Sequence, residues 1–222
     1  MQLPPKSTAA GRILRASRRT LARLKANPKA KALLPKFKPA HDALKAAQLA
    51  YNDADDVAID ASALVEECDY NAREALTDFQ LDLVAFVRRD YTAALYVHFF
   101  KDGLGAAKDG QGQVLQATLT AVIGHLATLP ADHKLQVHAK PLQTALAAYA
   151  EPLAAETKAL AARDAAWTAL DVARNQWLTA YDALAGSLRA LFPGRKAFVD
   201  GFFARWTGGK GKAKVDAGPA PV

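Results

Sequence analysis

The feature that most constrains the fold is a long stretch, residues 40–101, that contains neither glycine nor proline. Glycine and proline are the residues that interrupt helices most strongly, so their absence predicts one continuous helix of about 93 Å. The composition favours the same structure, because the chain holds 50 alanines and only three isoleucines. No alternating run bounded by turn residues indicates a strand. We therefore expect an all-α fold.

Apolar residues recur every seven positions along this stretch, which is the period of helices that pack side by side. One row contains Leu44, Tyr51, Ala58, Val65, Ala72, Phe79, Phe86 and Ala93, and a second contains Ala47, Ala54, Ala61, Cys68 and Ala75. The second row is uniformly small and permits close approach of another helix. Residues 142–191 carry similar rows, and a glycine-rich turn separates the two segments. We expect an elongated antiparallel hairpin of long helices or a helical bundle, closed within one chain or between chains.

Shorter elements complete the predicted organisation. A helix is expected from residue 7 or 8 to 26, followed by a proline-containing linker over 28–39. Further helices are expected at 111–128, 153–191 and 195–206, with Pro141 and Pro152 kinking or breaking the return segment. The prediction has three parts, namely a basic arm with its linker (1–38), a helical domain ending in a short aromatic helix (39–207), and a disordered basic tail (208–222).

The formal net charge of +7 is distributed unevenly along the chain. Residues 1–41 hold eleven Lys and Arg and no acidic residue, and residues 205–222 carry a net charge of +3. The remaining segment, 42–204, is therefore acidic, at −7. A basic arm and a basic tail flank an acidic helical body.

The arm is amphipathic at about 100° per residue. Its apolar side holds Ile13, Leu14, Ser17, Leu21 and Leu24, and the other side holds Arg12, Arg15, Arg18, Arg19, Arg23 and Lys25. Three interpretations follow: binding of a polyanion such as nucleic acid, binding to a membrane surface, or packing of the apolar stripe on the protein's own body or on a neighbouring subunit. A membrane role is disfavoured because the apolar face is short and has no Trp or Phe. No base-reading motif is present, so any nucleic-acid binding is expected to be non-specific.

An acidic run in the first half of the long stretch is the expected counterpart of the arm. Its docking strip is Asp53, Asp56, Asp60 and Glu67, with further acids at Asp55, Glu66 and Asp69. A divalent cation bound by Asp53, Asp56 and Asp60 is the alternative, but a solvated or docking strip is favoured.

No motif indicates catalysis, a metal or a cofactor. A di-metal helical bundle needs Glu-x-x-His pairs, and the sequence has none. Cys68 lies in the small-residue row and has no histidine partner in sequence, so we expect a buried, inert thiol. The glycine pairs at 103–105 and 110–112 follow no strand, and Lys108 is not placed as in a phosphate-binding loop. We expect a non-catalytic protein without catalytic residues, metal, cofactor or small-molecule substrate.

The last helix presents large apolar residues that need a cover, namely Phe198, Phe202, Phe203 and Trp206. They either close the end of the bundle, against Tyr96, Phe99 and Phe100, or form an interface for a partner or a second copy.

The sequence as a whole predicts a helical structural or assembly protein. Its long helices would mediate self-association or dock partners, and its basic arm would engage an acidic protein surface or nucleic acid. A peripheral membrane-binding protein is the first alternative, and a metal-binding or enzymatic bundle the second. The single cysteine, the lack of a membrane-spanning stretch and the lack of a secretory signal favour the cytoplasm.

Overall fold

The computed structural model describes residues 3–4, 8–204 and 206. Within these residues the secondary structure is helical and contains no strand, which confirms the prediction of an all-α fold. None of the helices in the described part is long and apolar enough to cross a membrane. The expected disordered tail, residues 208–222, lies outside the described residues.

The chain divides into two compact units. Unit 1 comprises Met1–Tyr51 and Ala166–Val222, and unit 2 comprises Asn52–Ala165. Two long helices contribute to both units, α2 and α7. In chain order the elements are α1 (Ala10–Ala26), η1 (Lys31–Leu33), α2 (Leu34–Phe86), α3 (Ala94–Phe99), α4 (Gly103–Lys108), α5 (Gln113–Ala127), η2 (Lys134–His138), α6 (Ala139–Ala147), α7 (Ala150–Leu191) and α8 (Lys196–Asp200).

The long helix α2 is shifted towards the N-terminus relative to the prediction. It begins at Leu34, inside the expected linker, and continues through Pro39. It ends at Phe86 rather than near residue 101, because Arg88 and Arg89 adopt positive φ angles of 53° and 63°. The Arg89 N–H bonds back to the Val84 carbonyl at 2.9 Å, which closes the helix in the manner of a Schellman motif. The prediction of an uninterrupted helix over 40–101 is therefore wrong after residue 86.

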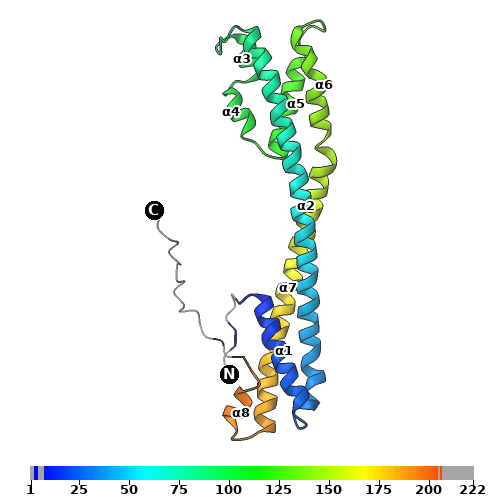
Figure 1. Cartoon of the computed structure of the whole chain (residues 1–222), viewed down its shortest axis with the longest axis vertical. Coiled ribbons are helices and arrows are strands. Elements are labelled where there is room, and N and C mark those ends of the chain that lie inside the picture. Colours follow the sequence, from blue (N-terminus) through cyan, green and yellow to red (C-terminus); the bar gives the residue numbers. More distant parts are fainter. Residues whose placement is uncertain (1–2, 5–7, 205, 207–222) are drawn as a thin grey trace, which may run out of the picture. The chain divides into compact units, whose positions relative to one another are not determined.

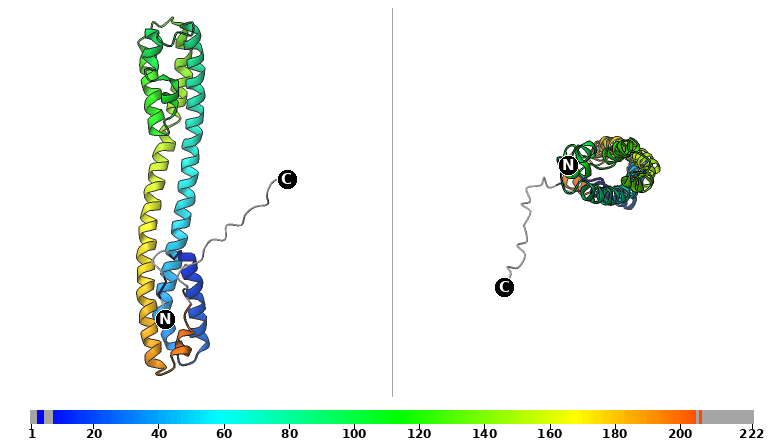
Figure 2. Two further views of the ribbon diagram at one scale, coloured as in Figure 1. Left: turned by 90° about the vertical axis from the view of Figure 1, so that its left-hand side faces the viewer. Right: turned by 90° about the horizontal axis from the view of Figure 1, so that it is seen from above.

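Unit 1 packs α1 against the first part of α2 and the last part of α7, as Figures 1 and 2 show. Its core is aromatic: the Trp177 and Tyr181 rings stack at 4.4 Å, and Phe37 of α2 lies about 6 Å from both. Ile13 and Leu24 of α1 are fully buried in this core. The apolar side of α1 therefore packs within unit 1.

Unit 2 surrounds the second part of α2 with α3, α5, α6 and the first part of α7 (Figure 1). Phe79 is fully buried and packs edge-on against Phe99 at 4.9 Å. A smaller cluster of buried alanines lies between α2 and α7, at Ala58, Ala61 and Ala159. These alanines include two members of the predicted heptad rows.

Candidate polyanion-binding surface

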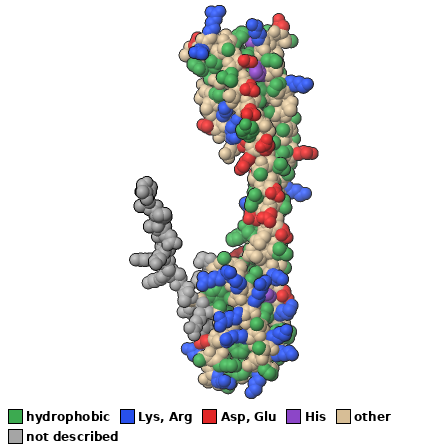
Figure 3. Space-filling view, viewed as in Figure 1, with side chains coloured by type: hydrophobic (Ala, Val, Ile, Leu, Met, Phe, Trp, Pro, Cys, Tyr) green, Lys and Arg blue, Asp and Glu red, His purple; other side chains and the backbone are tan. Residues whose placement is uncertain are grey.

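The two units carry opposite charge. Unit 1 contains 20 Lys and Arg residues against five Asp and Glu, a formal charge of +15, whereas unit 2 contains nine against 17, a formal charge of −8. Figure 3 shows Lys and Arg side chains gathered over the surface formed by α1 and the adjoining ends of α2 and α7. The polarity along the chain thus becomes a polarity between folded units.

Helix α1 presents its cations to solvent because its other side is buried. Ile13 and Leu24 are inaccessible, and so are the polar residues Ser17 and Thr20 on the same side. All six cations that the sequence singled out are exposed: Arg12, Arg15, Arg18, Arg19, Arg23 and Lys25. At about 100° per residue, Arg12, Arg15, Arg19 and Arg23 fall within an arc of about 80°. Each of these residues lies about 4.5–6 Å further along the helix axis than the one before it, so the four form one basic row.

A buried polar network fixes this orientation of α1. Ser17 Oγ lies 2.8 Å from His41 Nδ1 of α2 and accepts a hydrogen bond from Trp177 Nε1 of α7 at 3.0 Å. Because the Trp177 N–H occupies an acceptor site of Ser17, the serine hydroxyl is placed to donate to a neutral His41. The Thr20 hydroxyl donates to the Phe202 carbonyl at 2.9 Å. These bonds join α1 to three other segments of unit 1.

The environment of His41 keeps its imidazole neutral. Burial lowers the pKa of His41, Asp42 opposes this effect, and Arg18, Lys45 and Lys38 lower the pKa further. The Ser17–His41 pair has the composition of a nucleophile and its base. Ser17 is fully buried, however, so a substrate has no access to its hydroxyl.

Two of the six α1 cations are held by neutral groups of the C-terminal segment. The Arg12 guanidinium lies over the Trp206 ring at 5.7 Å, and an Arg23 N–H donates to the Gly201 carbonyl. The other four are Arg15, Arg18, Arg19 and Lys25. None of the ion pairs found within residues 8–204 involves them. Their charges therefore remain available to an external anion.

Folding adds cations that sequence reasoning did not assign to the arm. Lys45 of α2, Arg189 of α7, and Arg195 and Lys196 at the start of α8 are exposed in unit 1. In the sequence, Lys45 lies on a different helix from α1, and the elements α2 to α6 separate the other three from it. No local sequence pattern could therefore group these cations with those of α1. The exposed residues Lys29, Lys31 and Lys36 extend the surface past the end of α1.

The acidic docking strip lies on α2 in unit 2. Asp53, Asp56, Asp60 and Glu67 are all exposed, and Glu67 accepts a long hydrogen bond from Asn71 at 3.5 Å. Its docking partner stays a prediction. Among the described residues no group of three or more His, Cys, Asp or Glu side chains is arranged to hold a metal.

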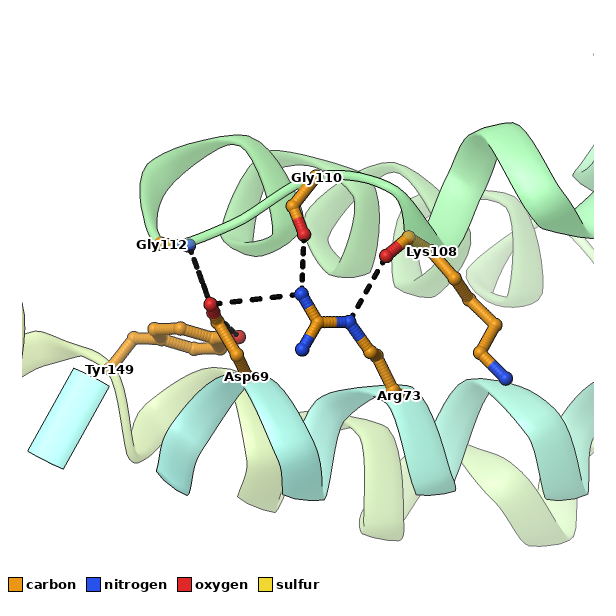
Figure 4. A network of polar contacts seen from close by, with 6 residues as sticks. All are labelled: Asp69, Arg73, Lys108, Gly110, Gly112 and Tyr149. Atoms are coloured by element: carbon orange, nitrogen blue, oxygen red, sulfur yellow. Dashed lines mark hydrogen bonds and ion pairs between the residues drawn. The ribbon is translucent and has the colours of Figure 1, made fainter. Parts of the chain in front are cut away.

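Asp69 has a different role from the rest of the acidic run. It is only 4% exposed and accepts hydrogen bonds from the Gly112 N–H at 2.9 Å and from the Tyr149 hydroxyl at 2.8 Å (Figure 4). Arg73, one turn further along α2, donates to the carbonyls of Lys108 and Gly110. The two residues therefore tie the 108–112 turn to α2, and they are structural.

A pocket of about 480 Å³ adjoins this network in unit 2. Two of its three carboxylates are engaged in the fold: Asp69 is bonded as described, and Glu156 accepts a hydrogen bond from Ser62 at 2.8 Å, whereas Glu66 is exposed. The Ser62–Glu156 hydrogen bond joins α2 to α7 across this pocket.

The aromatic residues of the last segment mostly close unit 1. Phe202, Phe203 and Trp206 are 2–4% exposed, and the Phe203 ring packs edge-on against Tyr181 at 4.9 Å. Phe198 is 36% exposed and is the member of this group that faces solvent. The expected packing against Tyr96, Phe99 and Phe100 is wrong, because those three residues lie in the core of unit 2.

The candidate site is thus a broad, exposed basic surface on a buried aromatic core. Comparison of the chain with protein-family models, with curated proteins and with solved structures finds no match.

Proposed function

We propose that this protein is a non-catalytic helical assembly protein that binds the phosphate backbone of nucleic acid through the basic surface of unit 1. The observation that carries the proposal is the orientation of α1. Its apolar face is buried, while Arg15, Arg18, Arg19 and Lys25 are exposed on a unit of formal charge +15. Exposed guanidinium groups that lack acidic partners bind phosphates through charge-assisted hydrogen bonds.

The same orientation argues against the membrane alternative. An interfacial helix must insert its apolar side between lipid headgroups. Ile13 and Leu24 would have to leave the aromatic core of unit 1 first, and Ser17 would have to leave His41 and Trp177. A polyanion needs only the side of α1 that is already exposed.

The binding is expected to be independent of base sequence. A row of cations on one helix face can follow a strand of phosphates, whereas base reading requires side chains placed in a groove by a dedicated motif. The affinity should therefore arise from released counterions and should weaken steeply with salt.

We further propose that α2 and α7 act together as one long antiparallel hairpin that provides surface for assembly. A second candidate partner for the basic surface is an acidic protein surface, and the −8 charge of unit 2 makes another copy of the chain a suitable one. Light scattering on nucleic-acid-free protein tests this candidate. A mass above the monomer that falls with added salt supports it, whereas a strict monomer at high concentration and low salt excludes it.

A charge-reversal pair tests nucleic-acid binding. The variant Arg15→Glu/Arg19→Glu changes two exposed residues of α1, and Lys134→Glu/Lys140→Glu changes two exposed residues of unit 2 by the same amount of charge. Fluorescence anisotropy with a labelled DNA duplex should show at least tenfold weaker binding for the first variant and a much smaller change for the second. Equal losses would show that net charge, rather than the α1 surface, controls binding. Circular dichroism verifies that both variants remain folded.

A further inference from the structure

A second basic feature of unit 1 is a concave one, at the turn between α7 and α8. A pocket of about 430 Å³ is lined there by Arg189, Phe192, Arg195, Lys196, Val199 and Asp200, together with Gly194. Three of these side chains are cationic and one is a carboxylate. The volume falls in the range of small-molecule sites.

The local fold explains why these residues converge. Helix α7 ends at Leu191, and Gly194, with a φ angle of +72°, reverses the chain before α8 begins at Lys196. The Arg195 N–H bonds to the Phe192 carbonyl at 3.2 Å and tightens the turn. Arg189 in the last turn of α7 is thereby brought to the same pocket as Arg195 and Lys196.

The pocket combines an apolar floor with a basic rim. Phe192 is 7% exposed and Val199 is 2% exposed, so both are anchored in the core of unit 1. The three cations are exposed, and the Arg195 guanidinium stacks over the Phe198 ring at 4.5 Å. This stacking restricts the arginine without neutralising its charge.

We propose that this pocket binds a nucleoside phosphate. Arg189, Arg195 and Lys196 would pair with the phosphate oxygens, and the side chains of Phe192 and Val199 would contact the base or the sugar. A ligand with a phosphate at one end and an apolar ring at the other matches the basic rim and the apolar floor better than inorganic phosphate does.

The inference goes beyond the proposed backbone binding, because it requires a saturable site at the α7–α8 turn rather than a broad surface. The phosphate could be supplied by a free nucleotide or by the 5′ end of a nucleic-acid strand. An oligonucleotide with a 5′ phosphate and the same oligonucleotide with a 5′ hydroxyl distinguish these sources. A preference for the phosphorylated strand identifies the strand end as a ligand, whereas equal affinity together with saturable AMP binding assigns the pocket to free nucleotides.

Isothermal titration of the full-length chain with AMP, adenosine and inorganic phosphate is the primary test. AMP should bind with a stoichiometry near one, phosphate should bind more weakly, and adenosine should not bind measurably. Absence of saturable AMP binding at millimolar concentration would overturn the proposal.

Matched single substitutions separate the pocket from general electrostatics. Lys196→Ala and Arg189→Ala should each weaken AMP binding about tenfold, whereas Lys134→Ala, which removes the same charge from an exposed position of unit 2, should leave it unchanged. Equal weakening by all three would overturn the pocket. Arg15→Glu/Arg19→Glu should weaken duplex binding at least tenfold but retain AMP binding, so that failure of the pocket and failure of the proposed backbone binding are distinguishable.

Discussion

Single buried polar residues fix which side of α1 faces solvent. Ser17 sits between an imidazole of α2 and an indole of α7, and its hydroxyl has a partner on each side. Replacing any one of the three by an apolar residue would leave a buried polar group without its hydrogen bond, and the resulting loss of stability exceeds the net contribution of the bond itself. The exposed cations of α1 thus depend on uncharged contacts on its opposite side.

Stability should depend on the protonation of His41. Its pKa in the folded chain lies below the ordinary 6.5, so the unfolded chain binds more protons as the pH falls through 6.5. The contribution of His41 to the free energy of unfolding should therefore have its full value above pH 6.5. It should be lost as the pH falls from 6.5 towards the lower pKa of the folded state. Urea unfolding from pH 8 to 5 measures the effect, with His41→Asn as the control because its amide oxygen can still accept from Ser17. A difference between wild type and control that is constant with pH, or that grows in the opposite direction, would contradict this account.

The Asp69 network should make Tyr149 energetically important. Tyr149→Phe removes a hydroxyl that donates to a carboxylate in a fully buried setting, so we expect a loss of about 2 kcal/mol in the stability of unit 2. Burial and the hydrogen bond to Asp69 both raise the pKa of Tyr149, in keeping with a neutral donor. Urea unfolding measures the change.

Tyr70→Phe is the matched control. The Tyr70 hydroxyl also donates to a carboxylate, that of Glu74, but Tyr70 is 57% exposed, so loss of this hydroxyl should have no measurable effect on stability. Similar effects of the two substitutions would show that burial is not decisive.

At the scale of elements, the sequence predicted the helical content well and the helix ends less well. The first helix ends at Ala26 as expected, because Asn27-Pro28 cannot continue it. The end of α2 was missed because Arg88 occupies a position where glycine is the usual signal. The start was missed because Pro35 lies in the first turn, where its missing N–H group would have had no partner within the helix, and because α2 continues through the interior residue Pro39. The α7–α8 pocket was missed because Arg189 and Lys196 meet only through the turn at Gly194.

The unusual end of α2 gives a prediction of its own. Arg88 has a φ of 53°, which is strained for a residue with a side chain, and the residue is exposed. Arg88→Gly should therefore stabilise unit 2 by about 0.5–1 kcal/mol, whereas Arg88→Ala should not stabilise it. Chemical unfolding of the two variants decides the point. Equal stability of the glycine and alanine variants would show that the left-handed conformation carries no strain.

At the scale of the whole molecule, the folded chain concentrates charge of opposite sign in two units. The basic arm was evident from the sequence, because residues 1–41 contain no acid. Its incorporation into a larger basic unit was not, since Arg189, Arg195 and Lys196 join it only through the return of α7. Unit 1 has a formal charge of +15 and unit 2 a formal charge of −8. The proposed function therefore rests on electrostatic binding.

The salt dependence of duplex binding tests this central claim most directly. If about five phosphates are neutralised, the logarithm of the association constant should fall with the logarithm of salt concentration with a slope of about −4.5. Arg15→Glu/Arg19→Glu should reduce the magnitude of that slope by about two, and Lys134→Glu/Lys140→Glu should leave it near the wild-type value. No duplex binding at low salt, or a slope unaffected by the α1 substitutions, would contradict the account.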